Sequence, residues 1–286
     1  VVAHNTERKG KWLWTDAGTG DLIGLYEAAD GEREALFIAD TIQRHIGANP
    51  RDRVAVLYRT NAQSRQVEEA LRRYGLKYLV LGGFSFYQRA EIRDALAYLK
   101  VLLSPGDSVS LLRIVNTPAR GIGRSTIEQI ERFAGERQVS IWAAVERMLQ
   151  EKLFAPRAEA ALSAFAKLIE ELREAAGHEP LQSVLELILD RTGYRKMLES
   201  DPSPDAEGRI ENLSELLNAA AEAAERGEGI ADFLDHAALA ADSDALDEQA
   251  QVSLLTLHNA KGLEFPVVFI AGMEDGLFPH SRSFSS

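Results

Sequence analysis

Two short apolar runs near the end of the chain limit its possible folds more than any other feature. Val252–Leu257 and Phe265–Ile270 have the composition of strands that are buried on both faces of a parallel sheet. The similar runs Arg53–Tyr58 and Tyr78–Leu81 lie about 170–200 residues earlier. Two independent domains in series would leave the late strands without a sheet. We therefore expect the early and late segments to form one sheet, with the residues between them as an insertion.

The outer segments alternate between strand and helix patterns. A further strand is expected at Leu22–Tyr26, and the spacing of apolar residues predicts helices over Glu34–Ile46, Ala62–Tyr74 and Glu91–Leu103. This alternation is typical of a doubly wound α/β sheet.

The middle of the chain differs in pattern and in charge. From Ser108 to about Ala241 nearly every window has helical periodicity, and Pro- and Gly-containing loops fall at 104–107, 177–180 and 201–205. Residues 106–250 hold 15 basic and 28 acidic residues, so they carry the acidic excess of a chain whose net charge is −12. An all-α insertion is therefore predicted, with crossings near Pro105 and Asp247. The expected domains are the first part of the α/β domain, the helical insertion and the second part of the α/β domain, at residues 1–105, 106–248 and 249–286.

Composition excludes several functional classes. The net charge of −12 argues against a protein that coats nucleic acid or membrane by bulk charge, although local basic patches remain possible. The absence of cysteine excludes disulfides and thiolate metal sites and suits a reducing cytoplasm. No apolar run approaches the roughly 18 residues of a membrane span, so no membrane partner is expected. The first residue is Val1 and the last, Ser286, follows a strand-and-loop segment, so both ends are interpreted as cuts through a longer protein, or alternatively as a processed or tagged chain.

The first candidate site follows the strand that ends at Tyr58. Thr60 or Asn61 can cap the next helix, whose free N–H groups suit a phosphate, and Arg59 adds a permanent cation. Contact with an anion or a nucleic-acid backbone is one interpretation. The other is that Asn61 is only a cap and the arginines, Arg65 included, are only solvated.

The second candidate is a glycine pair followed by aromatic residues. Gly82-Gly83 permits close backbone approach, and Phe84, Phe86 and Tyr87 could stack on bases beside Arg89. Core packing of Phe84 and Phe86 is the alternative.

The third candidate is a turn, Gly121-Ile122-Gly123, between Arg120 and Arg124. Ser125 and Glu128 are expected to form a capping box, so the turn would lead into a helix with its amides exposed. Such a turn could hold a duplex phosphate without reading bases. A tight connection between helices is the alternative.

The fourth candidate is the polar loop between the two late strands. Thr256, His258, Lys261, Gly262 and Glu264 are crowded into it. Polar groups at the edge of a sheet are costly unless they bind something. Lys261-Gly262 could meet a phosphate and Glu264 a ribose hydroxyl, whereas a lone His258 is more often structural. No metal site is expected. The sequence contains no G-x-x-x-x-G-K-[ST] loop and no acidic pair at a strand end, so this chain alone is not expected to hydrolyse a nucleotide.

Taken in order, these segments resemble the superfamily 1 DNA helicases of the UvrD/PcrA/Rep type. The matching segments are Val56–Arg65, Gly82–Phe84 with Phe86-Tyr87, Arg89 and Glu91-Ile92, Pro118 with Arg120–Gly123, Arg209 with Glu211–Leu213, Thr256–Phe269, Gly272–Gly276 and Phe278–His280. The resemblance implies the C-terminal motor half, truncated before the last helicase motif. Residues 1–105 and 249–286 would form a RecA-like lobe, called 2A, of the P-loop NTPase type, and 106–248 the mobile insertion, called 2B.

The resemblance also implies roles for individual residues. Contacts to single-stranded DNA would come from Tyr58, Arg59, Asn61, Ser64, Phe84 and Arg89. Nucleotide binding and its coupling to DNA would come from Thr256, His258, Lys261, Gly262 and Glu264. The duplex would be gripped by Arg120, Gly121, Ile122, Gly123 and Arg124.

For the intact parent, the resemblance implies an ATP-dependent 3′-to-5′ DNA helicase of repair or replication, located in the bacterial cytoplasm at the nucleoid. ATP and Mg²⁺ would be its cofactors, with neither held tightly by this chain alone. Its partners would be single-stranded and duplex DNA, the missing N-terminal motor lobe, and repair or transcription proteins docked on 2B. Two rival interpretations are a non-enzymatic helicase-like module that binds DNA or protein, and a subunit of a helicase–nuclease.

Overall fold

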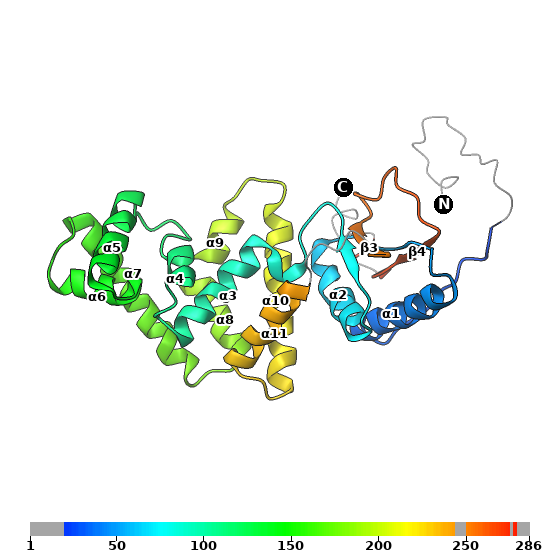
Figure 1. Ribbon diagram of the computed structural model, residues 1–286, viewed down its shortest axis with the longest axis horizontal. Coiled ribbons are helices and arrows are strands. Elements are labelled where there is room, and N and C mark those ends of the chain that lie inside the picture. The colour runs from blue at the N-terminus through cyan, green and yellow to red at the C-terminus, as the bar shows by residue number, and fades with distance from the viewer. Residues whose placement is uncertain (1–19, 244–249, 275–276, 279–286) are drawn as a thin grey trace.

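The computed structural model describes residues 20–243, 250–274 and 277–278. A small sheet lies at one end of an elongated molecule, and a group of helices extends from it to the other end (Figure 1). The predicted crossing near Asp247 and both ends of the chain lie outside the described residues.

The sheet has four parallel strands in the order β2-β3-β1-β4. They are β1 (Val54–Tyr58), β2 (Tyr78–Val80), β3 (Val252–Thr256) and β4 (Val267–Ile270). Val54 is aligned with Val252 on one side and with Val267 on the other. The prediction that the late strands lie beside the early ones is therefore confirmed.

Two helices cover one face of this sheet. They are α1 (Gly31–Ala48), whose N-cap Asp30 accepts a 2.8 Å hydrogen bond from the Arg33 amide, and α2 (Ser64–Arg73), which follows the short 3₁₀ turn η2 (Asn61–Gln63). Both contribute to one core with Val54, Val56 and Leu254. The doubly wound pattern predicts helices on both faces, whereas in the described part of the chain α1 and α2 share a face. Side chains of β4 that point to the other face, Val268 and Ile270, are 47% and 44% exposed.

The strand predicted at Leu22–Tyr26 is wrong. This segment has no regular secondary structure, and Leu22, Ile23 and Leu25 are at least 94% exposed. The Tyr26 ring instead stacks on Phe37 of α1, with 3.7 Å between ring centroids. An apolar run becomes a strand only where a neighbouring strand accepts its backbone hydrogen bonds, and no pairing with it is found within the described residues.

The helical part begins directly after Gly82-Gly83 and shares one large hydrophobic core. Its elements are η3 (Phe86–Gln88), α3 (Ala90–Leu103), α4 (Ser108–Ile114), α5 (Arg124–Arg137), α6 (Ile141–Gln150), α7 (Pro156–Ala176), α8 (Leu181–Arg191), α9 (Tyr194–Glu199), α10 (Ala206–Glu225) and α11 (Ile230–Ser243). The three predicted loops fall between helices, as expected. Helix α3 lies before the boundary predicted at residue 105, yet its Ile92 and Leu99 belong to the core of the later helices. Across the described segments, no helix has both the length and the apolar character needed to cross a membrane.

Candidate nucleic-acid and nucleotide interface

The carboxyl ends of β1, β3 and β4 lie at one edge of the sheet, because the three strands are parallel and in register. Tyr58 is aligned with Thr256, and the Leu257 amide donates a 2.8 Å hydrogen bond to the Tyr58 carbonyl. The segment that starts at Arg59 and the polar loop that starts at Leu257 are therefore neighbours in space, although about 200 residues separate them in the sequence. This is the edge at which open α/β sheets bind ligands.

Two side chains that the sequence analysis did not single out tie the loops of this edge together. Gln63 Oε1 accepts 2.9 Å hydrogen bonds from the backbone amides of Arg59 and Thr60. A Cβ on Gly272, after β4, would lie 2.0 Å from Gln63 Nε2, so Gln63 packs directly on that glycine. The Gly272 amide also donates to the Glu34 carboxylate of α1, at 3.0 Å and 3.2 Å. The spacing Thr60-x-x-Gln63 is that of a capping box and could have predicted the contact with the Thr60 amide, whereas no local pattern marks the contacts of Gly272.

The polar loop presents its side chains to solvent. Thr256 Oγ1 accepts a 3.2 Å hydrogen bond from the Asn259 amide, and Gly262 adopts a positive φ of 88°. His258, Lys261 and Glu264 are exposed. Arg59 and Asn61 are exposed on the adjacent segment. The structure thus brings the start of this loop and the Arg59–Asn61 segment to one solvent-facing edge. Glu264 lies toward the opposite edge, because the next residue, Phe265, contacts Arg53 before β1.

The glycine pair lies against this polar loop. Gly82 has a φ of 76°, and a Cβ there would lie 2.5 Å from Asn259 Nδ2. Phe84, two residues later, is 68% exposed, whereas Phe86 and Tyr87 are buried in the helical core. Of the three aromatic side chains predicted to stack on bases, only Phe84 is therefore accessible.

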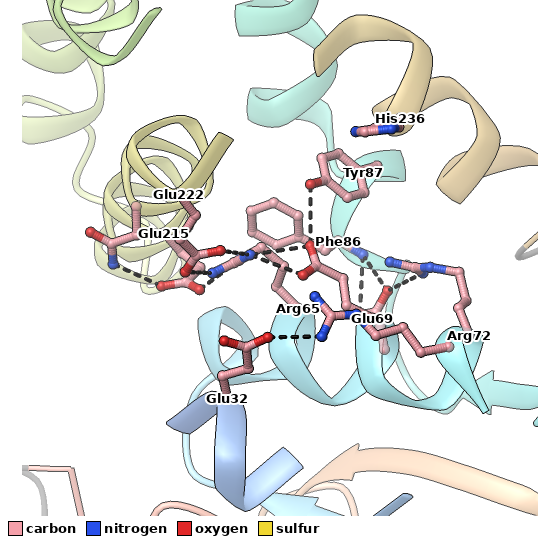
Figure 2. A network of polar contacts seen from close by, with 12 residues as sticks. Glu32, Arg65, Glu69, Arg72, Phe86, Tyr87, Glu215, Glu222 and His236 are labelled. Atoms are coloured by element: carbon pink, nitrogen blue, oxygen red, sulfur yellow. Dashed lines mark hydrogen bonds and ion pairs between the residues drawn. The ribbon is translucent and has the colours of Figure 1, made fainter. Parts of the chain in front are cut away.

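An ion-pair network around the buried Arg65 joins α2 to α10, as Figure 2 shows. The Arg65 guanidinium is 1% exposed and meets carboxylates from both helices: Nε lies 2.7 Å from Glu215, Nη2 lies 2.8 Å from Glu222, and Nη1 lies 3.1 Å from Glu69. Burial alone would lower the pKa of Arg65, but the carboxylates outweigh burial and raise it. The interpretation of Arg65 as a solvated arginine is wrong, because its side chain holds the sheet unit and the helical part together.

A second buried network surrounds Arg89. Its Nη1 donates to Asn212 Oδ1 at 2.8 Å and its Nη2 to Ser64 Oγ at 2.6 Å, while Ser64 Oγ donates to Glu68 at 2.6 Å. Burial lowers the pKa of Arg89, and the Glu68 carboxylate opposes that shift. Tyr58 is also buried, which raises its pKa. In this structure a DNA strand cannot reach Tyr58, Ser64 or Arg89, so their predicted contacts with single-stranded DNA have no support from the geometry.

The glycine turn before α5 is built around two anchors. The Ile122 side chain is fully buried, and Asn116 Oδ1 accepts hydrogen bonds from the amides of Arg120 and Ile122, at 2.7 Å and 3.3 Å. Gly121 has a φ of 79°, while Gly123 is the N-cap of α5 with a φ of −77°. Both glycines are exposed, so the turn presents its backbone to solvent.

The two arginines that flank this turn differ in availability. Arg120 Nη1 donates to the carbonyls of Ile114 and Pro118 at 3.0 Å, and Nη2 donates to Tyr98 Oη at 2.6 Å. Its guanidinium is therefore already hydrogen-bonded within the protein. Arg124 is 92% exposed and pairs with Glu128 at 2.9 Å. The predicted capping box is wrong, because α5 begins at Arg124, upstream of Ser125, and Glu128 bonds to Arg124 rather than to the backbone.

Together, the parallel sheet with polar loops and the large helical part define a mixed α/β protein. The model of the UvrD-like helicase C-terminal domain matches residues 1–286. The chain belongs to this family.

The sequences of several bacterial DNA helicases align with this chain over nearly its whole length. It is 41% identical to DNA helicase II of Haemophilus influenzae over 291 residues, 40% identical to the ATP-dependent DNA helicase PcrA of Bacillus subtilis over 294 residues, and 42% identical to the ATP-dependent DNA helicase UvrD1 of Mycobacterium tuberculosis over 308 residues. These alignments cover 99–100% of this chain. The chain spans about 40% of the length of each relative.

Proposed function

We propose that this chain supplies the second motor lobe and the duplex-contacting arm of an ATP-dependent 3′-to-5′ DNA helicase of repair or replication. In this proposal the sheet unit is the RecA-like lobe 2A and the helical part is the insertion 2B. The observation that carries the proposal is the meeting of Arg59 and Asn61 with the start of the polar loop, which holds the exposed His258, at the carboxyl edge of the sheet.

The side chains of the loop between β3 and β4 fit one side of a nucleotide site. Lys261 offers a cation to a phosphate and Glu264 an acceptor to a ribose hydroxyl, but the sequence has no phosphate-binding loop. ATP bound with Mg²⁺ would supply free energy through its hydrolysis. The phosphate loop and metal ligands would come from a separate N-terminal motor lobe, and this chain alone would bind ATP weakly.

Contacts with DNA would come from two exposed features. Phe84 would offer a stacking surface to a base of the single strand. The turn at Gly121–Gly123 would approach the duplex backbone. We propose a bacterial cytoplasmic location at the nucleoid, with repair or transcription proteins as further partners of the helical part.

The test is DNA-stimulated ATP hydrolysis by the chain joined to the segment that precedes it in its gene. Glu264→Ala and Lys261→Ala should lower hydrolysis at least tenfold, since each removes an interaction at the edge of the nucleotide site. Lys100→Ala, which removes an exposed cation on α3, is the matched control and should leave the rate unchanged. Hydrolysis by the 286-residue chain alone, or equal rates in all variants, would contradict the proposed role of this loop.

The duplex contact has its own test, because Gly123 can be replaced without strain. A Cβ at Gly123 meets no atom within 4 Å, and both Asp and Asn are favourable N-caps. Gly123→Asp places a negative charge at the turn and should weaken the binding of a labelled DNA duplex much more than Gly123→Asn does. Equal effects of the two variants would refute contact between this turn and phosphate.

A further inference from the structure

A third arginine lies at the glycine turn, and it comes from a different helix. Arg157 is in the first turn of α7, 36 residues after Gly121 in the sequence. A Cβ built on Gly121 would lie 4.0 Å from Arg157 Nη2, so the guanidinium lies directly beside the turn. Arg157 is exposed, and within residues 20–243, 250–274 and 277–278 no hydrogen bond or ion pair engages its side chain.

The three arginines at this turn are therefore in different states. Arg120 is committed to two backbone carbonyls and the Tyr98 hydroxyl. Arg124 is held by an exposed pair with Glu128, a type of contact that contributes little and exchanges readily. Arg157 has all its side-chain donors available beside a turn whose backbone is exposed.

Resting on the proposed duplex contact, we propose that Arg157 binds a phosphate of duplex DNA at the turn, together with Arg124. Gly121 leaves the space between its own backbone and the guanidinium free of a side chain, so a phosphate could approach both. The planar guanidinium can donate two parallel hydrogen bonds to one phosphate. The charge of Arg157 would also offset, at this one place, the repulsion that the acidic helical part exerts on DNA.

The experiment is a salt titration of the 286-residue chain with a fluorescein-labelled DNA hairpin, followed by anisotropy between 50 and 200 mM NaCl. Arg157→Ala should weaken binding roughly tenfold at low salt, since it removes a charge-assisted hydrogen bond. It should also reduce the slope of log K against log salt by about 0.9, the value for one phosphate contact. Arg157→Lys should restore the slope, because it keeps the charge, but only part of the affinity.

Arg132→Ala is the matched control. Arg132 is exposed on α5, eight residues or about 12 Å along the helix from Arg124, which is too far for a direct hydrogen bond to a phosphate held at the turn. Its loss should leave the slope unchanged. If Arg157→Ala behaves like Arg132→Ala while Gly123→Asp weakens binding, the assignment of Arg157 is wrong and the duplex contact of the turn stands. If Gly123→Asp also has no effect, or the chain does not bind the hairpin at 50 mM salt, the proposed duplex contact is itself refuted.

Discussion

Replacing Arg65 by Met should destabilise the chain more than any exposed substitution does. The Arg65 side chain is 1% exposed and lies within 2.7–3.2 Å of carboxylate oxygens from Glu69, Glu215 and Glu222. Removing one partner of a buried ion pair costs about 3–5 kcal/mol. The carboxylates left behind are 15–42% exposed and regain part of their hydration, so we expect a loss near the lower end, about 3 kcal/mol.

Urea unfolding followed by circular dichroism measures this loss. In a thermal scan the same change corresponds to a decrease in Tm of roughly 6–12 °C, at about 2–4 °C per kcal/mol for a chain of this size. Arg93→Met removes an exposed arginine of α3 and should change the free energy of unfolding by less than about 0.5 kcal/mol. Adding Glu222→Gln to Arg65→Met should recover part of the stability, because it removes one of the carboxylates left facing each other. A loss below 1 kcal/mol, or strict additivity in the double variant, would refute the reasoning.

Three further predictions concern backbone turns and one helix cap. Gly272→Ala should cost more than Gly75→Ala, because both positions have positive φ but only at Gly272 would the Cβ overlap Gln63; equal costs in urea unfolding would argue against that contact. Gly82→Ala should be destabilising, and Asn259→Ala in the same chain should recover stability by removing the atom it meets; no recovery would exclude the contact. Asp107→Ala should cost about 1 kcal/mol at pH 7, since Asp107 caps α4. Hydrogen bonds from Ser110 lower the pKa of Asp107, so this contribution is full above the usual pKa of an aspartate and is lost as pH falls through the lowered value; an unfolding difference that persists unchanged at pH 2 would contradict it.

The sheet could be predicted because its signal is both local and topological. Apolar β-branched runs define the strands, and the absence of other partners requires Val252–Thr256 to pair with Val54–Tyr58. The same local signal failed at Leu22–Tyr26, since an apolar run does not specify a neighbour. It also could not show that α1 and α2 share a face, because helix placement depends on connections rather than on periodicity.

The site was predictable only in part. Whether an arginine side chain is bonded within the fold or free to bind a ligand depends on residues far away in the sequence. The exposed loop with Lys261 and Glu264 follows from its position between two strands. Arg120 is bonded within the fold through Tyr98. Arg65 is buried against Glu222, which lies 157 residues away in the sequence. Neither contact leaves a pattern in the sequence, and the same holds for Arg157 beside Gly121.

The pairing of β1 with β3 has a consequence for biosynthesis. Val54 emerges from the ribosome about 200 residues before its partner Val252, which at 5–20 residues per second is a delay of roughly 10–40 s. During that interval β1 has neither of its eventual neighbours, whereas most of the helical core can already assemble. The newly made sheet unit therefore passes through a stage with an open strand edge, which is a ready template for pairing with another chain.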